Sequence, residues 1–135
     1  MLTALAACLL LSTSVAAQRE SSTSSGPVFT SEQATAGRLE FERSCARCHA
    51  PADGAERRAP ALSGPRFREK WGDRRVRDLF VRMRDGMPPI GVRPRGDGYA
   101  SILAFLLRDN GRPAGAAPLD PLSYDRLTLQ DRAVR

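Results

Sequence analysis

The sequence of 135 residues predicts an all-α domain of three or more short helices. Apolar residues recur three or four positions apart in three segments, as on one face of a helix. Stretches rich in proline and glycine, which interrupt regular structure, separate these segments. No segment shows the alternating pattern of a strand. Three short helices within about 80 residues bury little core, so the fold requires a further apolar component.

The first 29 residues are expected to lie outside this domain. Residues 2–17 are uncharged, mostly apolar and short for a membrane span, and they end in small residues. Residues 1–17 are therefore expected to be a cleaved signal peptide that exports the protein to the periplasm, leaving no transmembrane span in the mature chain. The apolar run continues beyond Cys8, which favours a signal peptide over a lipoprotein cleavage box. The serine-rich residues 18–29 predict a flexible linker.

The first helix is expected to begin near residue 30. Thr30 and Gln33 fit a capping box, which satisfies backbone N–H groups at a helix start. Phe41 continues the helical apolar spacing towards a pair of cysteines. Gly37 lowers helix propensity by about 1 kcal/mol relative to alanine, so its expected use is the close approach of another helix.

The cysteine pair carries the chemistry of the chain. Cys45, Cys48 and His49 form the pattern C-x-x-C-H, the signature of covalent haem attachment. Each thiol can add across one vinyl group of a haem, and a nitrogen of His49 can then bind the iron. No other histidine in the chain can supply this ligand. The motif predicts one covalently bound haem c, whose ring supplies the missing apolar interior.

Other uses of a C-x-x-C pair fit the sequence less well. A redox dithiol usually follows a strand of a βαβ unit, and no such strand pattern precedes Cys45. A structural zinc site needs four ligands. Beyond Cys45, Cys48 and His49, the expected mature chain contains no further cysteine or histidine.

A loop and a second helix are expected next. Residues 50–65 contain three prolines and two glycines and predict an ordered loop without regular structure. The second helix is expected to have Asp73 as its N-cap and to end at Asp85-Gly86. Its apolar face consists of Val76, Leu79, Phe80 and Met83.

Residues 86–98 contain four glycines and three prolines, which exclude a helix or a central strand. A loop of this length is uncommon unless it has a function. Met83 lies on the apolar face of the second helix, where a core role explains it, whereas no packing period explains Met87. We therefore favour Met87 over Met83 as the second axial ligand of the iron. His/Met ligation raises the reduction potential and leaves no iron position for oxygen or peroxide.

A third helix is expected from about Gly98 to Asp109, with Asp97 as its N-cap and Asn110-Gly111 at its end. Its apolar face consists of Tyr99, Ile102, Leu103 and Leu106. Residues 116–135 predict an irregular tail to which the sequence assigns no role, with a short turn around residues 122–129.

The net charge of +6 is concentrated in residues 66–84, where eight basic and three acidic residues give +5. This basic stretch predicts a docking site for an acidic surface of a redox partner. The alternative is a solvated helix face with the pairs Asp73–Arg77 and Asp78–Arg82. No nucleic-acid partner is expected, because the chain lacks a recognised binding fold and an array of basic and aromatic residues.

With these residues in place, the chain resembles the class I bacterial cytochromes c over residues 30–115. The helix ending in C-x-x-C-H, the proline-containing loop, the Met-Pro-Pro segment and the last helix follow the order of that family. The chain is most similar to small cytochrome c domains and subunits that accept electrons from quinoprotein dehydrogenases. The resemblance implies the cytochrome c fold and an electron carrier rather than an enzyme. Its redox partner would be a dehydrogenase, an oxidase or another cytochrome.

The resemblance also implies roles for individual residues. Pro60 resembles the proline whose carbonyl accepts a hydrogen bond from the ligating histidine, here His49. Trp71 resembles an aromatic residue near a haem propionate, with a core role as the alternative. Gly37 and Phe41 would meet the last helix.

Two other functions compete with electron transfer. One is a haem enzyme or gas sensor with an open sixth coordination site. The chain has no second histidine for peroxidase chemistry, and 86 residues follow His49, whereas the haem motif of four-helix gas-binding cytochromes lies near the C-terminus. The other is a structural subunit with an incidental haem.

Overall fold

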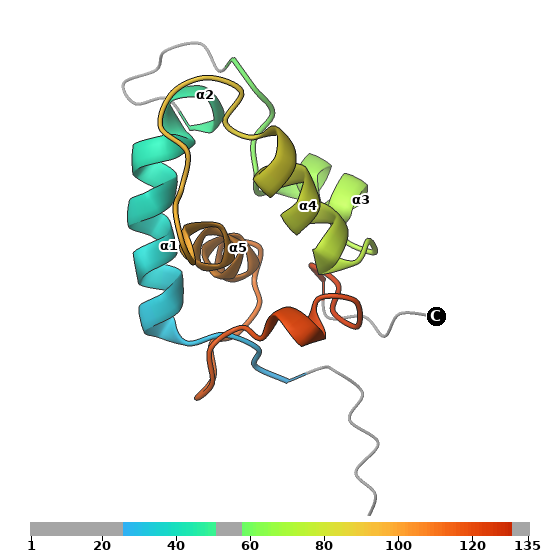
Figure 1. Ribbon diagram of the computed structural model, residues 1–135. Helices are drawn as coiled ribbons and strands as arrows, with labels where there is room; N and C mark the ends of the chain where they lie inside the picture. Colours follow the sequence, from blue (N-terminus) through green and yellow to red (C-terminus); the bar gives the residue numbers. More distant parts are fainter. Residues whose placement is uncertain (1–25, 51–57, 131–135) are drawn as a thin grey trace, which may run out of the picture.

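The structure is a computed structural model that describes residues 26–50 and 58–130. Within these residues it contains five α-helices and one short 3-10 helix but no strand. They are α1 (Ser31–Ser44), α2 (Ala46–His49), α3 (Pro65–Trp71), α4 (Val76–Gly86), α5 (Gly98–Asp109) and η1 (Pro121–Ser123) (Figure 1). The all-α prediction is confirmed. The expected signal peptide lies outside the described residues, among which no helix is long and apolar enough to cross a membrane.

Helices α1 and α5 form the most extensive helix–helix contact among the described residues. As predicted, Thr30 caps α1, and its hydroxyl accepts a hydrogen bond of 3.1 Å from the N–H of Gln33. At Gly37, an added Cβ would lie 1.8 Å from the carbonyl oxygen of Ser101 in α5. The predicted close approach of a second helix at Gly37 is therefore confirmed, and Phe41 extends the contact by packing against α5.

Helix α5 is the centre of the core (Figure 1). Its buried residues are Tyr99, Ile102, Leu103, Ala104, Leu106 and Leu107. The predicted bounds of this helix are confirmed, including Asn110 at its C-cap and Gly111 with a positive φ of 96°. Asp97 occupies the N-cap as predicted, but its backbone carbonyl, not its side chain, accepts the bond from the N–H of Ser101, at 2.9 Å.

The second predicted helix differs from the observed one at its start. Helix α4 follows Arg75 as N-cap, so the assignment of this cap to Asp73 was wrong. The C-terminal tail supplies the hydrogen-bond acceptors for the first backbone N–H groups of α4. The N–H of Val76 donates to the carbonyl of Leu127 at 2.8 Å, and the N–H of Arg77 donates to that of Tyr124 at 3.1 Å.

Helix α3 was not predicted. It begins immediately after Gly64, with Pro65 in its first turn, a position where a missing N–H is no loss. Its buried residue is Phe67. The end of α4 at Gly86 and the segment without helix or strand from Met87 to Asp97 agree with the prediction.

The described part of the tail belongs to the core although it has little regular structure. Its buried apolar residues are Leu119, Tyr124, Leu127 and Leu129. The Gln33 side chain does not complete a capping box, because its oxygen accepts a 2.7 Å hydrogen bond from the N–H of Leu119.

The end of the expected linker is likewise part of the domain. Phe29 is fully buried, and its carbonyl accepts a 2.7 Å hydrogen bond from the N–H of Gly115. The packed domain therefore begins a few residues before residue 30, and a flexible linker over the whole of residues 18–29 was wrong at this end. Residues 18–25 lie outside the described residues.

Candidate haem-binding site

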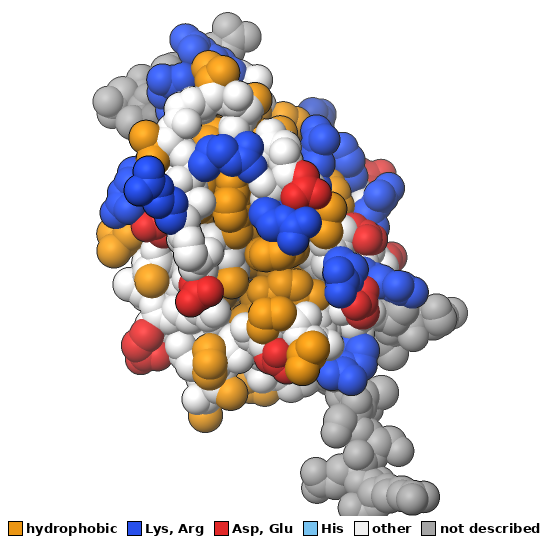
Figure 2. All heavy atoms as spheres, viewed as in Figure 1, with side chains coloured by type: hydrophobic (Ala, Val, Ile, Leu, Met, Phe, Trp, Pro, Cys, Tyr) orange, Lys and Arg blue, Asp and Glu red, His pale blue; other side chains and the backbone are white. Residues whose placement is uncertain are grey.

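A cavity of about 850 Å³, including its open mouth, is lined by residues of all five helices and of the segment after α4. Most of the lining side chains are apolar, among them Leu79, Ile102 and Leu106. The space-filling view shows apolar side chains along a hollow in this face, with basic side chains beside it (Figure 2). The cavity therefore suits a large apolar ligand.

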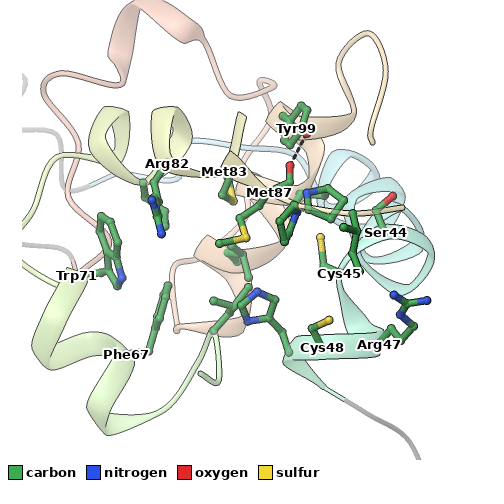
Figure 3. A pocket seen from close by; sticks show the side chains of 18 residues that line it. Ser44, Cys45, Arg47, Cys48, Phe67, Trp71, Arg82, Met83, Met87 and Tyr99 are labelled. Carbon is green, nitrogen blue, oxygen red and sulfur yellow. Dashed lines mark hydrogen bonds between the residues drawn. The ribbon is translucent and has the colours of Figure 1, made fainter. Parts of the chain in front are cut away.

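The cysteines lie at one end of the cavity. Cys45 is the C-cap of α1, and Cys48 and His49 belong to the single turn of α2. This turn is closed by bonds of 3.1 Å from the N–H groups of Cys48 and His49 to the carbonyl of Cys45. Figure 3 shows the sulfurs of Cys45 and Cys48 on one side, with Trp71 and Phe67 on the opposite side.

Both thiols are free and half-buried. Burial, together with smaller effects of the nearby Cys48 and Glu40, raises the pKa of the Cys45 thiol to about 11. At neutral pH this group is therefore the protonated thiol. Addition of a thiol across a vinyl group places the sulfur on one carbon and the hydrogen on the other.

His49 is oriented by the loop before α3. The Nδ1 atom of His49 lies 2.6 Å from the carbonyl oxygen of Pro60, to which it donates a hydrogen bond. This bond assigns the proton to Nδ1 and leaves the lone pair of Nε2 for a metal. A 3.1 Å bond from the N–H of Ala59 to the carbonyl of Cys48 holds the same loop against α2.

Both candidate methionines line the cavity. Met83 is buried in α4, with 7 % of its surface exposed, and Met87 is half-buried directly after that helix. The Met87 side chain extends between the cysteine end and the Trp71 end (Figure 3). The assignment of Met87 rather than Met83 as a ligand stays a prediction.

Five of the predicted site residues line this single cavity, and Pro60 adjoins it through His49. The five are Cys45, Cys48, His49, Trp71 and Met87. Two thiols at one edge, an oriented imidazole and an apolar lining fit a covalently attached haem, and a thioether is one group that can supply a second axial ligand. Among the described residues, no group of three or more His, Cys, Asp or Glu side chains could hold a metal ion.

Several residues that line the cavity were not predicted as site residues, among them Phe67, Arg82 and Tyr99. Phe67 and Trp71 are four residues apart, a helical spacing that could have revealed both α3 and this wall. Their ring centroids are 6.4 Å apart. Arg82 lies towards the Trp71 end (Figure 3). No sequence signal separates Arg82 from the other arginines of the basic stretch.

Comparison with known proteins agrees with this site. A family model described as cytochrome c oxidase, cbb3-type, subunit III matches residues 32–106, more than half of the chain. The match includes the C-x-x-C-H motif, the Met-Pro-Pro segment and most of α5. No curated protein and no solved structure matches the chain. The chain therefore belongs to the family of cbb3-type cytochrome c domains and is a class I monohaem cytochrome c that binds covalently attached haem c.

Proposed function

We propose that this cytochrome c is a periplasmic carrier of single electrons. Its haem is attached through Cys45 and Cys48, and His49 and Met87 are the axial ligands of the iron. The haem supplies the one-electron redox step. The observation that supports this proposal best is that the side chains of His49 and Met87 line the same cavity as the two thiols. With both axial positions filled, oxygen and peroxide have no site on the iron.

The protein contributes orientation and shielding. The Pro60 carbonyl fixes the ring and the proton of His49, which raises the basicity of the ligating nitrogen. The apolar lining excludes water, and low polarity around a haem favours its less charged, reduced form.

The end of the cavity opposite the cysteines is proposed to hold the haem carboxylates. The vinyl groups and the carboxylates occupy opposite edges of a haem, and Trp71 and Arg82 lie opposite the cysteines (Figure 3). The Arg82 guanidinium would offset the charge of the carboxylates, because an anion beside an apolar pocket needs a compensating charge. None of the ion pairs found among the described residues involves Arg82.

We propose that a redox partner docks on the basic stretch of residues 66–84, which covers most of α3 and α4 and the connection between them. Arg77 pairs with Asp125 of the tail at 2.6 Å, and Arg84 pairs with the adjacent Asp85 at 2.8 Å. Both pairs are at the surface and leave most of the positive charge of this stretch uncompensated. We propose an acidic redox protein as the partner. The sequence resemblance suggests a dehydrogenase as the electron donor, and the description of the matched family suggests a terminal oxidase as the acceptor.

Visible spectra of the purified haem protein, with and without carbon monoxide, test the proposed ligation. We expect low-spin spectra in both oxidation states and little reaction of the reduced protein with carbon monoxide, because Met87 occupies the sixth position. Rapid carbon monoxide binding by a reduced protein without low-spin bands would instead identify an open site, as in a haem enzyme or gas sensor.

A further inference from the structure

The backbone of Met87 is held on both sides of the residue. Its N–H donates a 2.9 Å hydrogen bond to the carbonyl of Met83, which is the last bond of α4. Its carbonyl accepts a 2.5 Å hydrogen bond from the hydroxyl of Tyr99 (Figure 3). Tyr99 is buried in the first turn of α5, the helix at the centre of the core. The Met87 peptide is therefore tied to two helices.

Arg93 holds the same segment from its outer side. One guanidinium nitrogen donates to the carbonyl of Pro88 at 3.5 Å, and another donates to the carbonyl of Arg84 in the last turn of α4. The guanidinium carbon also lies 5.9 Å from the centre of the Tyr99 ring, a cation–π distance. Arg93 thus joins the loop, the end of α4 and the ring of Tyr99.

These contacts tie the part of the segment nearest to Met87 to the domain. Residues 87–97 contain neither helix nor strand. Ile90 and Val92 are 69 % and 67 % exposed, so the apolar side chains near the middle of the loop do not anchor it in the core. The hydrogen bonds to the carbonyls of Met87 and Pro88 are therefore the polar contacts closest to the Met87 side chain.

We propose that Tyr99 and Arg93 are positioning residues for the sixth iron ligand. By holding the carbonyls of Met87 and Pro88, they keep the Met87 thioether in the cavity and disfavour the conformation in which another ligand replaces it. This inference rests on the proposed His49/Met87 ligation. Loss of one neutral hydrogen bond is expected to raise the population of that open conformation about two- to tenfold.

Tyr99→Phe tests the inference, because it removes the hydroxyl and keeps the ring. Tyr124→Phe is the matched control, since the Tyr124 hydroxyl is also buried but has no hydrogen-bond partner in the described structure. The measurement is the equilibrium constant for carbon monoxide binding to the reduced haem protein. We expect it to rise about two- to tenfold in Tyr99→Phe and to stay at the wild-type value in Tyr124→Phe. Equal values in the two variants would overturn the role of Tyr99.

Arg93→Ala provides a second test that does not change the core. Arg95→Ala is its control, because it removes the same charge from an exposed position of the same loop. We expect Arg93→Ala to raise carbon monoxide affinity above that of Arg95→Ala and to accelerate hydrogen exchange of the amides of residues 87–97. If both variants change affinity and exchange equally, the effect is one of charge and Arg93 does not position the loop.

The result with the wild-type protein separates this inference from the proposed function. A reduced wild-type protein that binds carbon monoxide rapidly contradicts the His49/Met87 ligation, and the positioning of a sixth ligand falls with it. A wild-type protein that resists carbon monoxide, together with a Tyr99→Phe variant that resists it equally, retains the ligation and contradicts the inference alone.

Discussion

The missing side chain of Gly37 determines how closely α1 approaches α5. Helix α1 carries Cys45 at its C-terminal end, and α5 carries residues that line the cavity. Contact between the two helix backbones therefore sets the distance between the cysteine end of the cavity and α5. The adjacent packing of Phe41 on Phe105, with ring centroids 5.2 Å apart, depends on the same approach.

Gly37→Ala is predicted to destabilise the haem protein. The added Cβ would lie 1.8 Å from a backbone oxygen, which cannot move aside as a flexible side chain could. Overpacking of this kind lowers the free energy of unfolding by about 1–3 kcal/mol, to be measured by denaturant unfolding. Gly26→Ala is the control, since no atom lies within 4 Å of a Cβ at Gly26. Equal stability of the two variants would contradict the close-contact explanation.

Residues whose roles depend on local spacing could be predicted from the sequence. Covalent haem attachment requires the spacing of Cys45, Cys48 and His49, and a glycine within a helix indicates a close contact. Tyr99 and Arg82 could not be predicted in the same way. Helical periodicity assigns Tyr99 to the buried face, but it does not reveal that its hydroxyl reaches the carbonyl of Met87, twelve positions earlier.

At the scale of the elements, α4 is positioned by contacts that are distant in sequence. The sequence predicts an N-cap three residues before Val76, whereas the first N–H groups of α4 donate to carbonyls of the tail, about 50 residues later. The tail also contacts the end of α3, because the N–H of Gln130 donates to the carbonyl of Gly72 at 3.1 Å. The described tail therefore supports the half of the domain that carries Trp71 and both methionines.

Leu127→Ala is predicted to destabilise the domain much more than Leu122→Ala. Leu127 is 2 % exposed and lies where the tail meets α4, whereas Leu122 is 81 % exposed on the same tail. Truncation of a buried leucine lowers stability by about 2–5 kcal/mol, whereas a surface change stays within about 0.5 kcal/mol. Thermal and denaturant unfolding of the haem proteins give both values. A tail that is dispensable for packing would leave the two variants equally stable.

At the scale of the whole molecule, the cavity is the interior that three predicted helices could not provide. The fold class and the presence of a covalently bound haem could be predicted from the motif and the helical periodicity. The sequence did not allow us to predict that Phe29 and parts of residues 116–130 belong to the core. Neither segment has a periodic apolar pattern, and both become buried only through contacts with distant parts of the chain. The family match ends at residue 106, before this tail.

Electron transfer to an acidic partner protein is predicted to slow as salt is added. The basic stretch of residues 66–84 carries a net charge of +5 and attracts a negative surface. Salt screens this attraction, because the Debye length falls from about 10 Å at 0.1 M to about 3 Å at 1 M ionic strength. Stopped-flow rates at increasing ionic strength measure this effect, with an uncharged small reductant as the control. A rate that is independent of salt with the acidic partner would exclude docking through this stretch.

The most direct test of the account is the midpoint potential of the Met87→Ala haem protein, measured beside Met83→Ala. Axial ligands set haem potentials over a range of about 0.8 V, and loss of a thioether ligand lowers the potential. We predict a fall on the order of tenths of a volt in Met87→Ala and a potential close to that of the wild type in Met83→Ala. A fall confined to Met83→Ala, or no fall in either variant, would contradict the assignment of Met87 as the sixth ligand.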